Sequence, residues 1–225
     1  MSTLRILAVD DHEMTPLGYK YILEDEPIGE YSIQLDIAKD YESGREKLDR
    51  SLQSFPYDII LLDIQLAPRN GDGAPPKSGE DLGIYARKVS PNSKIVFMSS
   101  YSDNFRINSI LQTVDPEGYM VKTEIDQYTL REMIPTVMKN PPYYTHKALA
   151  AIRRKMANDD MGLDATDKKI LHLLSIGTKT KDMVDHLPLS LPGIENRKRQ
   201  IKSLFGIEKQ NDQALINEAR HRGFI

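Results

Sequence analysis

The chain has 225 residues, of which 40% are hydrophobic and 28% are charged, and it contains no cysteine. This length predicts two domains, and the composition excludes a fibrous or intrinsically disordered protein. The absence of cysteine excludes a disulfide framework, a thiolate metal site and thiol catalysis, and it favours a reducing compartment. Apolar runs such as residues 59–62 are too short to cross a bilayer, and the N-terminus turns acidic where a signal peptide stays apolar. We therefore expect a cytoplasmic protein with no membrane partner.

Charge is distributed unevenly along the chain, whose formal net charge is −3. Residues 161–225 carry 11 Lys and Arg against 8 Asp and Glu, a net +3, which leaves 19 against 25, or −6, in residues 1–160. A difference in charge between two parts of a chain indicates two functions. The basic part is compatible with nucleic-acid binding, although the asymmetry is modest.

Short β-rich runs alternate with helical patterns through the first 140 residues. The β-rich runs are residues 5–9, 33–37, 58–62, 94–98 and 118–121. The helical segments are residues 16–23, 43–52, 80–88, 104–112 and 127–138. Strict alternation predicts an α/β domain with a doubly wound, five-stranded parallel sheet and helices on both faces.

The segment Asn140-Pro141-Pro142 ends the last of these helices, because proline lacks a backbone N–H and disfavours a helical residue before it. Beyond it the pattern is wholly helical. The expected domains are residues 1–139 and 163–225. A linker over residues 140–162, which contains a helix, joins them. Four short helices in about 60 residues, with the third over 191–204 and the last over 213–220, suit a helix-turn-helix module.

Polar side chains stand at the carboxyl ends of four predicted strands. They are Asp10 and Asp11 after the first strand, Asp63 after the third, Ser99 and Ser100 after the fourth, and Lys122 after the fifth. Parallel α/β sheets bind ligands at this edge. Three carboxylates in one cleft repel one another, so we expect a divalent cation, Mg²⁺ or Mn²⁺. Beside it Asp63 can attack a phosphoryl group while Lys122 and the Ser99 hydroxyl bind phosphoryl oxygens.

Each residue has a plainer interpretation when it is taken alone. An Asp after a strand is often a helix N-cap, a Lys is usually solvated, and Tyr119 can be ordinary aromatic packing. The specific signal is the joint pattern over four strand ends.

The segments Val9-Asp10-Asp11-His12, Leu61-Leu62-Asp63, Met98-Ser99 and Gly118-Tyr119-Met120-Val121-Lys122 resemble the signature positions of bacterial response-regulator receiver domains. Residues 177–206, with Gly223-Phe224-Ile225, resemble the LuxR-type helix-turn-helix of the NarL/FixJ family. The resemblance covers most of the chain. It implies a flavodoxin-like receiver sheet in the order 2-1-3-4-5, followed by an all-α four-helix LuxR-type domain.

The resemblance also implies a two-component response regulator. A sensor histidine kinase would phosphorylate Asp63 in the presence of Mg²⁺, which Asp10, Asp11, Asp63 and the Gln65 backbone carbonyl would hold. Ser99 and Tyr119 would rearrange on activation. The phosphorylated protein would form a homodimer that binds double-stranded DNA and regulates transcription. We expect no enzymatic turnover beyond transfer of the phosphoryl group to its own Asp63.

Two departures from the family pattern concern the predicted site. The segment from Pro68 to Lys77 enlarges the loop after Asp63 and delays the matching glycine, Gly79, to sixteen residues beyond it. Its Gly, Pro and Asn content predicts irregular backbone, either as a tolerated insertion or as a lid that changes phosphate lifetime or kinase choice. Asp115-Pro116 replaces a usual Gly-Ala pair, which alters the expected switch geometry.

The helix over residues 191–204 is expected to enter the major groove of DNA, with Ser190 as N-cap and Pro192 in its first turn. Aligned with the LuxR-type module, Glu195, Asn196 and Arg199 fall where base contacts are usual, and Lys198 and Lys202 where phosphate contacts are expected. The family often has lysine where Glu195 stands. Its carboxylate either accepts from cytosine N4 or repels the DNA backbone.

Two other functional classes compete with the regulator. A phosphatase-like enzyme of the haloacid-dehalogenase class shares the sheet and the Asp nucleophile, but it needs a second acid two residues later, where Gln65 stands. A signalling adaptor would use the C-terminal helices to bind protein instead of DNA. Salt-dependent binding to duplex DNA separates the adaptor from the regulator.

Overall fold

The computed structural model describes residues 1–67, 77–100, 104–159, 162–222 and 224–225. The chain divides into two compact units, and the main boundary between them lies between Leu149 and Ala150. That boundary falls inside the linker expected over residues 140–162. Within the described residues, no helix combines the length and the apolar character needed to span a membrane.

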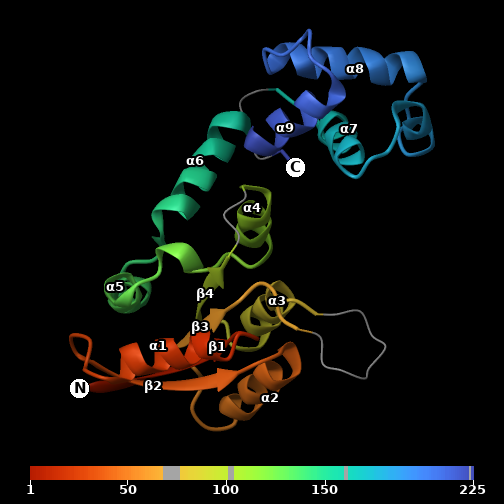
Figure 1. Ribbon diagram of the computed structural model, residues 1–225. Helices are drawn as coiled ribbons and strands as arrows, with labels where there is room; N and C mark the ends of the chain where they lie inside the picture. Colours follow the sequence, from red (N-terminus) through yellow and green to blue (C-terminus); the bar gives the residue numbers. More distant parts are fainter. Residues whose placement is uncertain (68–76, 101–103, 160–161, 223) are drawn as a thin grey trace. The chain divides into compact units, whose positions relative to one another are not determined.

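The first unit is a parallel sheet flanked by helices (Figure 1). Its strands are β1 (Ser2–Val9), β2 (Tyr31–Ala38), β3 (Ile59–Leu62), β4 (Lys94–Ser99), β5 (Gly118–Val121) and β6 (Tyr143–Tyr144). Its helices are α1 (Met14–Glu24), α2 (Tyr41–Leu52), α3 (Gly79–Val89), the 3₁₀ turn η1 (Lys122–Glu124) and α5 (Gln127–Lys139). The helix α4 (Asn104–Thr113) is divided, with residues 104–108 assigned to the second unit and residues 109–113 to the first. The helix α6 (His146–Asp159) follows in the chain and crosses the boundary.

The strand order is β2-β1-β3-β4-β5-β6, and every neighbouring pair is parallel. The predicted α/β class and the order 2-1-3-4-5 are therefore confirmed. The predicted number of strands is wrong by one, because β6 adds a sixth strand beside β5. The strand β6 has two residues and directly follows Pro141-Pro142. It is therefore too short to show any periodicity in the sequence.

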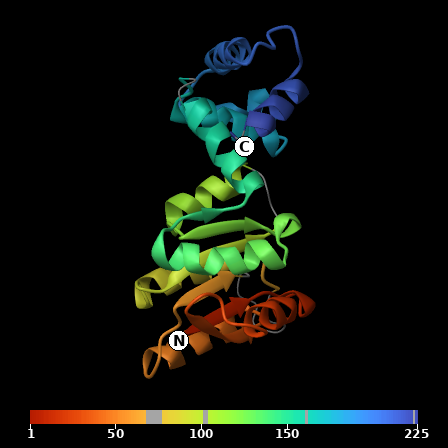
Figure 2. The same ribbon diagram turned by 90° about the vertical axis from the view of Figure 1, so that its left-hand side faces the viewer.

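Helices cover both faces of the sheet, as Figure 2 also shows. The β1 residues Leu4, Ile6 and Ala8 pack with α1 and α5 in one continuous core. On the opposite face, α2 and α3 approach closely at glycines: Gly44 lies beside Val9, and Gly83 lies beside Phe97. All four residues of β3 are buried, as expected for a central strand with helices on both sides.

The second unit is built from short helices around one apolar core. They are α7 (Ala165–Ser175), the 3₁₀ helix η2 (Thr180–Asp185), α8 (Leu191–Leu204) and α9 (Asp212–Arg222). The second of the four expected helices is thus a single 3₁₀ segment, which is too short for the α form to be distinguished from sequence. The helix α8 begins and ends at the predicted residues. Gly177 after α7 and Gly206 after α8 have φ of 85° and 71°, the left-handed conformation that ends helices at glycine.

Candidate functional site

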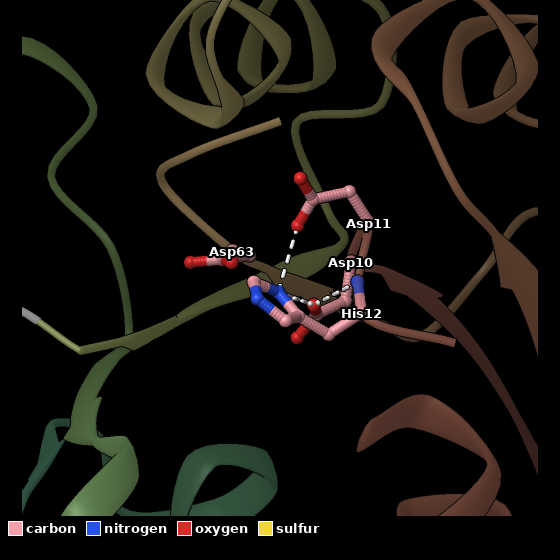
Figure 3. Close-up of side chains that lie close together, drawn as sticks. All are labelled: Asp10, Asp11, His12 and Asp63. Atoms are coloured by element: carbon pink, nitrogen blue, oxygen red, sulfur yellow. Dashed lines mark hydrogen bonds and ion pairs between the residues drawn. The ribbon is translucent and has the colours of Figure 1, made fainter. Parts of the chain in front are cut away.

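The carboxyl edge of the sheet gathers an acidic cluster (Figure 3). One donor atom from each of Asp10, Asp11, His12 and Asp63 lies within 4.8 Å of the others. The register explains this proximity, because β1 pairs with β3 and the Asp63 N–H donates to the Val9 carbonyl at 2.8 Å. The strand ends therefore bring together the three carboxylates that the sequence predicts at one site.

Two carboxylates of the cluster are buried. Asp10 and Asp63 are 3% and 5% exposed. Lys122 Nζ lies 2.7 Å from Oδ2 of Asp10, and His12 Nδ1 lies 2.9 Å from Oδ1 of Asp11, so each of these buried oxygens has a polar neighbour. Because a carboxylate oxygen carries more than one lone pair, such oxygens can also bind a hard divalent cation.

Lys122 bridges two of the carboxylates from the end of β5. Its Nζ lies 2.7 Å from Asp10 Oδ2 and 2.8 Å from Asp63 Oδ2, and it donates a hydrogen bond to the latter. Burial opposes the charge on Lys122, yet the bonds and charges of the two carboxylates hold its pKa above the ordinary value. The lysine therefore stays protonated beside the acidic cluster.

The carboxyl of Asp63 titrates abnormally. Burial raises its pKa above the ordinary value, and the hydrogen bond and charge of Lys122 only partly oppose this effect. A perturbed pKa in a cleft with a specific charged partner is typical of functional sites.

The remaining predicted site residues occupy different environments around this edge. Ser99 ends β4 fully buried and pairs in register with Val121, directly before Lys122. Ser100 is exposed. Tyr119 is fully buried and stacks on Phe97, with ring centroids 6.4 Å apart. Its ring therefore makes ordinary aromatic packing in this conformation.

Gln65 and the enlarged loop follow Asp63 in the chain. Gln65 is exposed, two residues after Asp63. Residues 68–76 of the loop lie outside the described part of the structure, so the lid hypothesis stays a prediction. Lys77, at the loop's end, places its Nζ 4.6 Å from the centroid of the Tyr41 ring.

Two residues next to the site, His12 and Gly79, were part of the sequence motifs but were not predicted as site residues. His12 places Nδ1 2.9 Å from Asp11 Oδ1 and 3.3 Å from Asp10 Oδ1, and its position directly after the two aspartates is the signal for its proximity. Gly79 begins α3 against the backbone of Asp63, where a Cβ would lie 1.7 Å from the Asp63 carbonyl oxygen. Its backbone N–H also donates to the Ile64 carbonyl at 2.9 Å.

The helix α8 presents a mixed polar face in the second unit. Glu195, Asn196 and Arg199, the three predicted base-contacting residues, are all exposed. They stand one and three residues apart and so share one side of the helix. This side is available to a partner.

The other cations of α8 are engaged within the second unit. Lys198 is 5% exposed, and its Nζ lies 2.7 Å from both Thr180 Oγ1 and Asp212 Oδ2. Lys202 contacts Asp212 Oδ1 at 2.9 Å and donates to the Gln210 carbonyl at 2.9 Å. This placement does not favour the phosphate contact expected of Lys198, because its ammonium group joins η2, α8 and α9 from inside the unit.

Comparisons with known proteins find relatives along almost the whole chain. No protein-family model matches the chain. Its relatives include the response regulator protein VraR of Staphylococcus saprophyticus, which is 22% identical over 97% of both chains. The transcriptional regulatory protein DegU of Brevibacillus brevis is 26% identical, over 86% of this chain and 77% of DegU. The DNA-binding transcriptional activator DevR/DosR of Mycobacterium tuberculosis is 25% identical, over 95% of this chain and 93% of the activator.

The chain is a homologue of NarL/FixJ-type response regulators. Solved structures show the same fold for this response-regulator homologue. RcsB of Salmonella enterica serovar Typhimurium, bound to the promoter P1flhDC with the phosphomimetic BeF₃⁻, has a TM-score of 0.63 at 18% identity, covering 96% of this chain and 98% of RcsB. An RcsB crystal form from Salmonella typhimurium has a TM-score of 0.67 at 19% identity, covering 95% of this chain and 98% of RcsB. The resemblance to NarL/FixJ-type response regulators recognised from the sequence motifs is confirmed.

Proposed function

We propose that this response-regulator homologue is a two-component transcription regulator that accepts a phosphoryl group on Asp63 and binds double-stranded DNA through α8. One observation carries the proposal: Lys122 bridges Asp10 and Asp63 inside a buried acidic cluster at the carboxyl edge of the sheet. A structural role alone does not account for this arrangement, because buried carboxylates at short separation destabilise a fold.

The carboxylates fit a magnesium ion. Asp10, Asp11 and Asp63 supply oxygen donors, and we propose the Gln65 carbonyl as a further ligand. Mg²⁺ or Mn²⁺ prefers such oxygen ligands and, when bound, neutralises charge on a phosphoryl group. The His12 imidazole stands beside this set and can hydrogen-bond its outer oxygens.

The chemistry of the proposed transfer rests on Asp63. One carboxylate oxygen attacks the phosphorus of a phosphohistidine on a sensor kinase, so an O–P bond forms and the N–P bond breaks. The imidazole leaves with the electron pair of that bond and takes up a proton. Lys122 then binds a phosphoryl oxygen, and the hydroxyl of the buried Ser99, at the end of the neighbouring strand, is proposed to bind another.

The proposed output is regulation of transcription by a DNA-bound homodimer. Two copies place two recognition helices on the half-sites of one operator. Glu195, Asn196 and Arg199 read bases, and Lys202 contacts phosphate by leaving Asp212. Both the kinase phosphohistidine and DNA are cytoplasmic in bacteria, so we propose a cytoplasmic location.

Labelling with a small phosphodonor tests the first part of the proposal. The protein is incubated with acetyl phosphate and Mg²⁺, and its intact mass is measured. We expect the mass of one phosphoryl group in the wild type and in the control Asp25→Asn, an exposed carboxylate of α1's C-terminus. Asp63→Asn should remain unlabelled, and chelation of the metal should prevent labelling of the wild type. Labelling of Asp63→Asn, or labelling that ignores chelation, would contradict the assignment.

Duplex DNA tests the second part. A DNA-binding regulator binds a specific duplex more tightly as the salt concentration falls, since each phosphate that the protein neutralises releases counterions. Binding to no duplex, from an operator-enriched pool or from random sequence, would leave the signalling adaptor as the better description of the α8 surface.

A further inference from the structure

The residues that follow α5 lie along β5 as an additional strand. Tyr143 N donates to the Glu117 carbonyl at 2.9 Å, and Thr145 N donates to the Tyr119 carbonyl at 3.2 Å. Residues 143–147, which we call the linker strand, therefore comprise the outer strand β6, Thr145 and the first two residues of α6.

The Thr145 side chain extends this pairing beyond the two residues of β6. Its Oγ1 accepts a hydrogen bond from the Val121 N–H at 3.1 Å. Both residues are buried, so the hydroxyl satisfies a backbone donor that water does not reach. Val121 is the residue directly before Lys122. The linker strand is thus tied to the backbone beside the site lysine.

Close approach of the linker strand depends on Gly118. A Cβ at this position would lie 2.9 Å from the Tyr143 carbonyl oxygen and 3.1 Å from Val96 Cγ1. The absence of a side chain lets the Tyr143 backbone contact β5 directly. The pairing is therefore built into β5 as well as into the linker strand.

The residues just after Lys122 hold the first turn of α6. Both oxygens of Glu124 accept from the Lys147 N–H, at 2.9 and 3.2 Å, and Lys147 Nζ donates to Thr123 Oγ1 at 2.8 Å. The first N–H groups of a helix lack partners within it, and a carboxylate there is favourable. Residues on both sides of Lys122 in the chain thus contact the linker strand.

We propose that the linker strand is the coupling element that reports the state of Asp63 to α6, an inference that rests on the proposed phosphorylation of Asp63. Lys122 now divides its bonds between Asp10 and Asp63. A phosphoryl group on Asp63 offers Lys122 a new anion, which fixes the backbone from Val121 to Glu124. Because Val121, Thr123 and Glu124 bond to the linker strand, that change reaches Thr145 and Lys147. The helix α6 continues from there in the chain toward the second unit.

Hydrogen exchange in the full-length protein measures this coupling. Peptides covering residues 118–125 and 143–150 are followed by mass spectrometry, with Mg²⁺ alone and with Mg²⁺ plus beryllofluoride, a phosphoryl mimic. We expect beryllofluoride to slow exchange of the linker-strand amides about five-fold, the factor that one net hydrogen bond provides. Unchanged or faster exchange of these amides in the wild type would overturn the proposal.

Thr145→Val removes the hydroxyl and keeps the shape of the side chain. We expect beryllofluoride still to slow amide exchange in residues 118–125 of this variant. In residues 143–150, the factor by which beryllofluoride slows exchange should fall to about one-fifth of the wild-type factor or less. The matched control is Thr136→Val, whose hydroxyl bonds the Glu132 carbonyl of its own helix and contacts no described residue of β5 or the linker strand through a hydrogen bond. A wild-type response in Thr145→Val would also overturn the coupling.

A second variant and an independent measurement keep the test decisive. If circular dichroism shows that Thr145→Val is unfolded, Glu124→Gln, which weakens the bond to the Lys147 N–H, carries the same expectation. Acetyl-phosphate labelling is measured on every variant. No labelling in any of them, wild type included, means that the proposed function has failed, whereas normal labelling without a linker response means that the coupling alone has failed.

Discussion

Gly79 occupies a position beside Asp63 where any side chain collides with the backbone. The 1.7 Å separation between a Cβ and the Asp63 carbonyl oxygen is far below van der Waals contact, and neither atom belongs to a flexible side chain. We expect Gly79→Ala to reduce the free energy of unfolding by about 3 kcal/mol, since overpacking displaces backbone here. It should also lower the rate of acetyl-phosphate labelling, because Asp63 moves with its carbonyl.

The matched control for Gly79→Ala is Gly18→Ala. Gly18 lies inside α1, and a Cβ there would have no neighbour within 4 Å. This substitution should leave labelling unchanged and stabilise the helix by up to about 1 kcal/mol. Chemical denaturation and intact mass report both quantities. Equal effects of the two substitutions would show that space beside Asp63 is not the cause.

Glu117 gives the first unit a pH-dependent contribution to stability. Burial opposes its ionisation, but hydrogen bonds from Arg87 and from the Ile95 N–H outweigh burial and lower its pKa. A carboxyl whose pKa is lowered by folding stabilises the fold above the unfolded-state pKa, and this contribution is lost as the pH falls through the folded-state pKa.

We therefore expect Glu117→Gln to destabilise the protein by about 2 kcal/mol at pH 7, with the difference from wild type shrinking below about pH 4. Urea denaturation across that range measures the effect. Glu26→Gln, at an exposed position in the α1–β2 loop, is the control and should change little at any pH. A difference between Glu117→Gln and wild type that does not depend on pH would show that ionisation of Glu117 is not its cause.

At the scale of single residues, sequence reasoning succeeded where chain order alone fixes position. Asp10, Asp63 and Lys122 meet because parallel strands end at one edge, so their proximity follows from predicting the strands. The environment of Lys198 was not predictable in this way. Its burial depends on where Asp212 and Thr180 lie in the folded unit, and a basic residue on a predicted helix gives no sign of partners 14 and 18 residues away.

Within α8, neighbouring cations have different expected functions. Arg199 is exposed, whereas Lys198 is buried against Asp212. Arg199→Ala should leave the free energy of unfolding unchanged and weaken binding to the specific duplex by roughly 1–3 kcal/mol, with relaxed preference at one base. Lys198→Met should destabilise the second unit by about 2 kcal/mol, because it removes a charged hydrogen bond from Asp212.

Denaturation and duplex titration on both variants separate these two effects. Lys202→Ala is informative as a third variant. If Lys202 contacts phosphate, its loss should weaken binding to all DNA sequences alike and reduce the slope of the logarithm of the binding constant against the logarithm of salt concentration by about one unit. If Lys198→Met is as stable as wild type and binds DNA less tightly at all sequences, the lysine contacts phosphate after all.

At the scale of elements, strong periodicity predicted the existence and type of every long helix and of five strands. The elements that differ are the shortest. The strand β6 exists because β5 offers an edge and Gly118 allows close approach, and both of these features come from tertiary structure. The helix η2 is 3₁₀ over six residues, a length at which periodicity cannot distinguish helix types.

For the whole molecule, the first unit presents an apolar surface that bears on assembly. Met14, Leu17 and Tyr21 are exposed along one side of α1, and Tyr128 is exposed on α5, which packs beside α1. Successive exposed apolar residues on a helix mark an interaction surface. This exposed apolar surface favours pairing of two copies through the first unit.

We expect beryllofluoride with Mg²⁺ to shift the wild type from monomer to dimer in analytical sedimentation, because activation of the proposed regulator pairs two copies on one operator. Leu17→Glu should keep the protein monomeric under both conditions while acetyl-phosphate labelling of Asp63 continues, since a charge is costly in an apolar interface. Ile84→Glu is the matched control: Ile84 is similarly exposed but lies on α3, so this variant should still dimerise. A wild type that stays monomeric with beryllofluoride at high concentration contradicts phosphorylation-driven assembly. Loss of the dimer in Ile84→Glu together with its retention in Leu17→Glu would instead move the interface from α1 to α3.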